Sequence, residues 1–155
     1  MKPNLKKLLI ALAIPLAVGG LSALVSGGMS GYNDLVQPPL SPPGWLFPVV
    51  WTILYLLMGY ASYRVATAGA SEAQTKQALT LYVIQLFLNF LWSPVYFGLE
   101  WRLVAFFILL ALWVAILLTL RAFSAIDEKA ADLLLPYILW VTFAAYLNLG
   151  TVLLN

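Results

Sequence analysis

The side chains of this sequence that suit chemistry within an apolar environment are aromatic rings and amides. The 155 residues contain neither cysteine nor histidine, so thiolates, the commonest general base and the usual axial ligands of haem iron are all missing. We also find no carboxylate pair, no Ser/His/Asp set and no phosphate-binding loop. We therefore predict no metal site and no resident cofactor, and the sequence by itself leaves open whether the protein is an enzyme.

The rings and amides recur at helical spacing in three stretches, and residues three or four apart share one face of a helix. The three faces contain Trp51, Tyr55, Gly59 and Tyr63, then Gln85, Asn89, Trp92 and Tyr96, and finally Trp140, Phe143, Ala144 and Asn148. Facing one another, three such helices would enclose a pocket that suits a flat, largely apolar ligand. The alternative is that the rings fill the bundle core and the amides join the helices.

The elements that must position these faces are membrane helices. The chain is 63% apolar and only 9% charged, whereas soluble domains are about 25% charged. Its charged residues separate five uncharged spans, each long enough to cross a hydrocarbon core, and none shows the alternation of a barrel strand. We predict an all-α integral membrane protein, a single domain over residues 1–155. It should be a bundle of five transmembrane helices near 5–27, 44–67, 77–98, 101–123 and 129–153.

The basic residues predict how this bundle is oriented. With the N-terminus inside, only Arg102 lies on the outer side. The inner side then holds Lys2, Lys6, Lys7, Arg64, Lys76, Arg121 and Lys129. This bias follows the positive-inside rule and places the first loop and the C-terminus outside. The net charge of +2 is scattered over short loops and does not indicate a nucleic-acid partner.

A proline-rich segment precedes the second helix. Four of the six residues 38–43 are proline, which fixes φ and removes backbone donors. We predict a stiff, extended connector that covers a pocket as a lid. The alternative is a plain turn between two helices.

Three motifs together resemble one family of membrane proteins. They are the Pro-Pro-x-x-Pro-Pro-Gly-Trp loop that runs into Trp51, the segment Gln-Leu-Phe-Leu-Asn-Phe-Leu-Trp-Ser-Pro-Val-Tyr at 85–96, and Leu-Pro-Tyr-Ile-Leu-Trp at 135–140 followed by Asn148. On these motifs the sequence is identified as a member of the tryptophan-rich sensory protein/translocator protein (TspO/MBR) family. The resemblance covers essentially the whole chain, including the number of helices.

The resemblance implies a five-helix bundle, often a homodimer, with a cavity beneath the first loop. Members bind porphyrins, haem and other tetrapyrroles, cholesterol in animals, and isoquinoline or benzodiazepine drugs. We expect a binding protein for such planar ligands with a transport or sensory role; the alternative is light-dependent oxidative degradation of protoporphyrin IX by Trp51 and Trp140. Carried over, the cavity residues are Tyr32, Pro42, Trp51, Asn89, Trp92, Trp140, Phe143 and Ala144. The helical faces add Tyr55 and Gln85.

One departure concerns sterols. Animal members carry a Leu-Tyr-Arg cholesterol motif late in the fifth helix, whereas Leu147 is followed here by Asn148, and no Lys or Arg occurs after Lys129. This motif is broken here, so the resemblance by itself gives no basis for predicting specific sterol binding.

Overall fold

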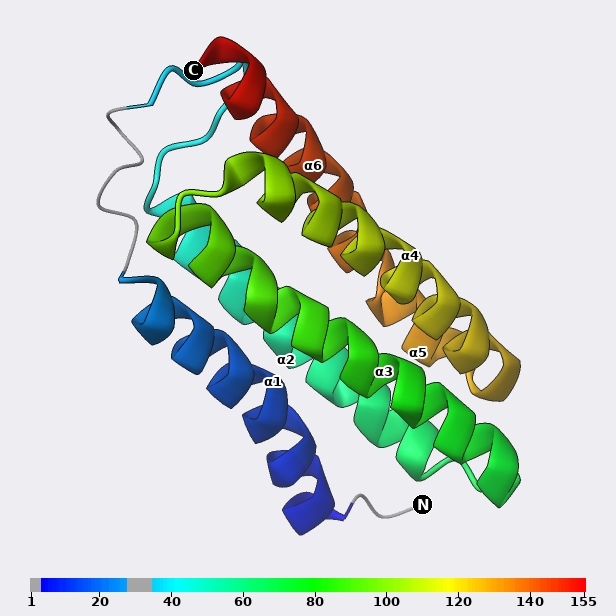
Figure 1. The fold of residues 1–155 in the computed structure, drawn as a ribbon. Coiled ribbons are helices and arrows are strands. Elements are labelled where there is room, and N and C mark those ends of the chain that lie inside the picture. Colours follow the sequence, from blue (N-terminus) through cyan, green and yellow to red (C-terminus); the bar gives the residue numbers. More distant parts are fainter. Residues whose placement is uncertain (1–3, 28–34) are drawn as a thin grey trace.

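The computed structural model describes residues 4–27 and 35–155, and these form an antiparallel helical bundle (Figure 1). Its elements are α1 (Leu5–Ser26), α2 (Leu46–Ala66), α3 (Glu72–Ser93), the π-helical turn η2 (Pro94–Gly98), α4 (Arg102–Ile126), α5 (Glu128–Leu133) and α6 (Leu135–Leu154). Together with η2, α3 forms one span, and α5 and α6 form another. The described chain thus contains five helices long and apolar enough to cross a membrane, which confirms the predicted fold class.

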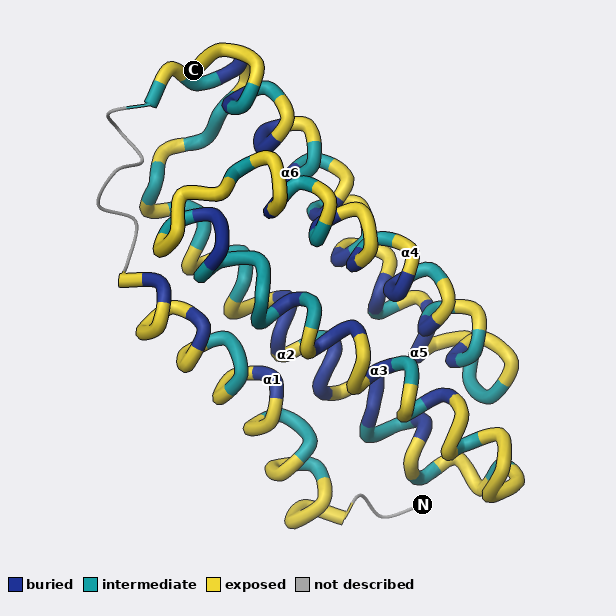
Figure 2. Tube along the Cα trace, in the orientation of Figure 1, coloured by how far each residue is buried: buried dark blue, intermediate teal, exposed yellow. Residues whose placement is uncertain are grey.

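The helices pack a core of large apolar, small and polar residues against one another, and many further large apolar residues face outward. Figure 2 shows the buried positions on the sides of the helices that face their neighbours. Leu9, Leu24, Phe87 and Phe107 are each more than half exposed on the outside of the bundle. This distribution suits a chain whose outer surface contacts lipid rather than water.

The third helix begins at Glu72, five residues before the predicted position 77. The prediction followed the apolar span, but the helix continues beyond it because Ser71 caps its start: the Ser71 side chain accepts a hydrogen bond of 3.2 Å from the Gln74 N–H. The C-terminal end of this span widens into η2 at Pro94, whose ring carries no N–H for a normal helical hydrogen bond.

The fifth helix, predicted as one element over 129–153, is interrupted at Leu134. Pro136 stands in the first turn of α6, where a missing N–H costs least, so α6 restarts at Leu135. The preceding turn also differs from the prediction, because α4 runs to Ile126 instead of ending at 123. It stops where Asp127 becomes extended and caps α5 by accepting a hydrogen bond of 3.0 Å from the Lys129 N–H.

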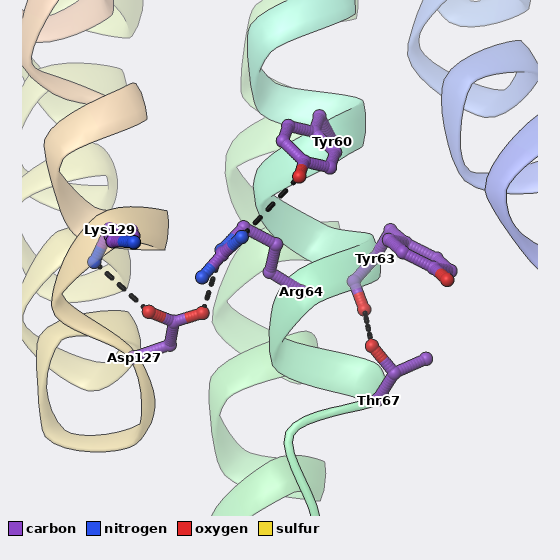
Figure 3. A network of polar contacts seen from close by, with 6 residues as sticks. All are labelled: Tyr60, Tyr63, Arg64, Thr67, Asp127 and Lys129. Carbon is purple, nitrogen blue, oxygen red and sulfur yellow. Dashed lines mark hydrogen bonds and ion pairs between the residues drawn. The ribbon is translucent and has the colours of Figure 1, made fainter. Parts of the chain in front are cut away.

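An ion pair joins α2 to this turn at the end of the bundle that also holds the start of α1. Arg64 Nε donates to Asp127 Oδ2 at 2.8 Å, and Tyr60 accepts a second bond from the same guanidinium at 3.3 Å (Figure 3). The neighbouring Tyr63 hydroxyl accepts from the Asn4 N–H at 2.9 Å. Three helices are thus joined by polar contacts at this end.

Helices α1 and α2 approach closely because each carries a glycine at the contact. A Cβ on Gly59 would lie 2.6 Å from the Ala11 carbonyl oxygen, and one on Gly19 would lie 2.2 Å from the Tyr55 ring. The gap that Gly59 leaves in the aromatic face of α2 is therefore filled by the backbone of α1. A ligand has no room at that position.

Candidate functional site

Residues 36–43, called the lid below, cross the end of the bundle that holds the C-terminus (Figure 1). The lid is not the extended connector predicted from its prolines. It reverses direction in a tight turn in which the Ser41 N–H donates to the Pro38 carbonyl at 3.3 Å. Leu40 adopts a positive φ of 71°, the value that the third residue of a type II turn requires. Pro39 fixes the preceding position of this turn, so the prolines stiffen a bend rather than a straight segment.

Three contacts fasten the lid to α6. The Tyr146 hydroxyl donates to the Pro39 carbonyl at 2.6 Å. Asn155 pairs with the backbone of Val36 in both directions, accepting from its N–H at 3.1 Å and donating to its carbonyl at 2.8 Å. The ring of Pro38 rests on Gly150. The lid therefore has a defined closed position on the last turns of α6.

A small cavity lies beneath the lid, called the lid cavity below. Its lining comes from the lid, the start of α2, the end of α3 with η2, and α6: Gln37, Ser41, Phe47, Trp92, Tyr96, Phe97, Ala144, Leu147, Asn148 and Thr151. Its volume is about 30 Å³. Pockets that bind small molecules measure about 300–1,000 Å³. In this closed form the cavity is too small for a planar ring system.

The walls of the lid cavity are stacked rings held by one amide. Trp92 stacks on Tyr96 with ring centroids 5.1 Å apart, and Phe97 meets Tyr96 edge-on at 4.7 Å. The indole N–H of Trp92 donates to Asn148 Oδ1 at 3.0 Å. Asn148 in turn donates to the Arg102 carbonyl at 2.9 Å. Because both ends of this amide are paired, the Trp92 ring is fixed as one wall.

A second polar cluster lies deeper in the bundle and is called the tyrosine–amide network. The Tyr55 hydroxyl donates to Asn89 Oδ1 at 2.9 Å, and Asn89 Nδ2 donates to the Tyr137 hydroxyl at 2.7 Å. Tyr137 then donates to Gln85 Oε1 at 2.7 Å. All four residues are buried. These amides join α2, α3 and α6, which is the structural alternative that the sequence left open for Gln85 and Asn89.

Trp51 packs against this network. Its ring stacks on Tyr55 at a centroid distance of 5.6 Å and meets Tyr137 edge-on at 6.2 Å. Trp51 and Tyr55 therefore share one face of α2, as their spacing predicted. This face packs against other side chains of the bundle.

Trp140 and Phe143 border a separate, wholly apolar groove between α2 and α6, called the outer groove. Its volume is about 410 Å³, and its lining residues are Val50, Ile53, Leu54, Leu57, Pro136, Leu139, Trp140 and Phe143. Leu139 is 69% exposed, so the groove opens at the bundle surface. The buried indole Nε1 of Trp140 has no hydrogen-bond partner among the described residues.

The predicted site residues thus fall in several places rather than around one pocket. Trp92 and Ala144 line the lid cavity, Trp140 and Phe143 line the outer groove, and Tyr55, Gln85 and Asn89 belong to the network beside Trp51. Pro42 is partly buried in the lid. Tyr32 lies outside the described residues.

Sequence reasoning missed the centre of the network and the lid contacts. Tyr137 was noted only within a motif, although a tyrosine three residues before Trp140 in an apolar run indicates a buried hydroxyl in need of a partner. Tyr146 and Asn155 gave no local signal. Their partners lie more than 100 positions earlier in the chain.

Comparison with known proteins agrees with this architecture. The model of the TspO/MBR family matches residues 11–154. A tryptophan-rich protein TspO of Chlorobaculum tepidum is 37% identical over 100% of this chain and 99% of its own length. A tryptophan-rich sensory protein of Cereibacter sphaeroides is 40% identical over 80% of this chain and 76% of its own. The translocator protein of Ovis aries is 38% identical over 78% of this chain and 72% of its own.

Proposed function

The chain belongs to the TspO/MBR family, and from this premise we propose that it binds planar, porphyrin-type tetrapyrroles beneath the lid. The names of its relatives, sensory protein and translocator protein, support a membrane sensory or transport role. The isoquinoline and benzodiazepine drugs expected from the resemblance are aromatic and largely apolar as well, and we propose the same location for them.

The observation that carries this proposal is the roofed aromatic cavity. Trp92, Tyr96 and Phe97 offer ring faces and edges, and Asn148 holds the Trp92 wall in place. Aromatic walls with few polar groups suit a flat macrocycle. The ligand enters when the lid leaves Gly150 and Tyr146, since the closed cavity holds only about 30 Å³. Binding is therefore coupled to lid opening, which gives a sensor or carrier two distinguishable states.

The experiment is a titration of the purified protein in lipid nanodiscs with protoporphyrin IX and with haem, followed by quenching of tryptophan emission. The sequence supplies no histidine or cysteine as an axial ligand, so recognition should depend on stacking and shape. We expect similar affinities for the metal-free and the iron porphyrin. Haem that binds about a hundredfold tighter, with the spectrum of strong axial ligation, would contradict this mode of recognition.

A second candidate function is light-dependent oxidation of the bound porphyrin by dioxygen. It is favoured by the contact of Trp51 with two hydrogen-bonded tyrosines, which places three oxidisable rings next to one another. Trp51 is the residue whose replacement separates this activity from binding alone.

A further inference from the structure

Arg102, the first residue of α4, carries a guanidinium that its surroundings leave incompletely paired. Its side chain is 19% exposed, and its Nε is buried with no hydrogen-bond partner in the described parts of the chain. Nη2 lies 4.0 Å from Glu100 Oε1, the outer limit of an ion pair, and the Glu100 side chain is 66% exposed. A buried N–H without a partner costs free energy. The start of a helix also disfavours a cation, so helix stability does not account for an arginine here.

Arg102 lies beside the lid cavity, and both its side chain and its backbone contact residues that line this cavity. Its guanidinium carbon lies 5.3 Å from the centroid of Tyr96, which lines the cavity. Its carbonyl accepts the hydrogen bond from Asn148, which lines the cavity too. The start of α4 lies at the same end of the bundle as the lid (Figure 1). A cation thus adjoins the part of the cavity wall that Tyr96 and Asn148 form.

We infer that Arg102 anchors a carboxylate of the ligand, so that the site prefers planar molecules with an acidic side chain over neutral ones. This inference rests on the function proposed above and names the ligand class more closely. A guanidinium pairs with a carboxylate through two parallel N–H groups, and the unpaired Nε supplies one of them. The Tyr96 face supports the cation from one side. The exposed Glu100 is the competitor that a ligand carboxylate displaces.

A matched pair of ligands tests the anchor. Protoporphyrin IX has two carboxylates, and its dimethyl ester has the same ring with both of them masked. Wild-type protein in nanodiscs should bind the diacid about tenfold tighter than the diester, since a charged hydrogen bond contributes roughly that factor. Arg102→Gln should lower diacid affinity about tenfold and leave diester affinity within about twofold. Arg102→Lys keeps the charge without the fork and should fall between the two.

Two further variants test whether the effect on affinity is specific to Arg102. Arg121→Gln, at an exposed arginine near the other end of α4, should change neither affinity. Glu100→Gln removes the competitor and should maintain or tighten diacid binding.

The inference is overturned if Arg102→Gln weakens the binding of diacid and diester equally, or weakens the binding of neither. In that case the proposed function still stands as long as the wild-type protein binds the diacid. If Arg102→Gln fails to fold, a wild-type preference of less than about twofold for the diacid overturns the inference without any variant. If wild type binds neither porphyrin, the proposed function itself fails, and the inference falls with it.

Discussion

The ring of Pro38 packs directly on the backbone of Gly150, and this is one of the three contacts that fasten the lid to α6. A Cβ at position 150 would lie 2.7 Å from Pro38 Cβ and 2.8 Å from its Cγ. Glycine within a helix costs about 1 kcal/mol relative to alanine. The helix therefore carries an unfavourable residue at a position where its absent side chain lets the lid approach closely.

Replacing Gly150 with alanine should loosen the lid while leaving the bundle folded. The added methyl overlaps the Pro38 ring, and overpacking of this kind costs about 1–3 kcal/mol. Hydrogen exchange at the Val36 and Ser41 amides should accelerate, because both amides are bonded in the closed lid. Gly20→Ala is the control, since nothing lies within 4 Å of a Cβ there. Unchanged protection of both amides in Gly150→Ala would show that the contact does not hold the lid.

The tyrosine–amide network should be more sensitive at Tyr137 than at Tyr55. Tyr137→Phe leaves both Gln85 Oε1 and Asn89 Nδ2 without the hydroxyl, whereas Tyr55→Phe leaves only Asn89 Oδ1. We expect a loss of about 1–3 kcal/mol for Tyr137→Phe and about 0.6 kcal/mol for Tyr55→Phe in unfolding by SDS. Equal losses for the two variants would indicate that water replaces the missing hydroxyl.

The ion pair and the helix cap at Asp127 can be separated by two substitutions. Asp127→Asn keeps an oxygen for the Lys129 N–H but loses the charge that pairs with Arg64 (Figure 3), and should cost about 0.2–1 kcal/mol. Asp127→Ala also removes the cap and should cost a further ~0.5–2 kcal/mol. Thermal unfolding in detergent measures both. An alanine variant as stable as the asparagine variant would rule out the cap contribution.

The contacts of Asp127 should also make the stability of the protein depend on pH. Burial works to raise the pKa of Asp127, but the hydrogen bonds from Arg64 and from the Lys129 N–H outweigh it and hold the pKa below its ordinary value. The folded state thus binds this proton more weakly than the unfolded state. The stabilisation should be complete above the unfolded pKa of about 3.9 and disappear as the pH falls through the folded value. The stability difference between wild type and Asp127→Asn should therefore be constant at neutral pH and shrink below about pH 4.

The predicted orientation can be tested with single cysteines, because the sequence contains none. Leu40→Cys lies in the lid, where the native side chain is 83% exposed, and Ala73→Cys lies in the exposed first turn of α3. An impermeant maleimide added to intact cells should label the first variant and spare the second until the membrane is permeabilised. The reverse pattern would overturn the orientation inferred from the basic residues.

Trp51→Phe should separate porphyrin binding from photochemistry. Phenylalanine retains an apolar ring against Tyr55 but is much harder to oxidise than indole. Affinity for protoporphyrin IX should stay within about tenfold, while any light-driven product, followed by absorbance and mass, should drop sharply. Undiminished product would exclude a redox role for this residue.

The sequence by itself determined the fold class, the number of helices and the family. The cost of burying charge in hydrocarbon acts on every residue of a span, so apolar runs between charges suffice to locate Leu46–Ala66 or Arg102–Ile126 within a few residues. The ends of the helices were less predictable. The capping at Ser71 and Asp127 depends on a single side chain and not on a run.

What the aromatic faces contact was decided only by the tertiary structure. Spacing places Trp51 and Tyr55 on one face of α2, but spacing carries no information on which neighbour that face meets. The rotation of each helix depends on its packing contacts, such as Gly59 of α2 against the backbone of α1. In the folded bundle Tyr55 bonds to Asn89, and Trp140 lines the outer groove. The fastening of the lid by Tyr146 and Asn155 depends likewise on residues more than 100 positions away. Such contacts are set by the packing of the whole bundle, because no local stretch contains both partners.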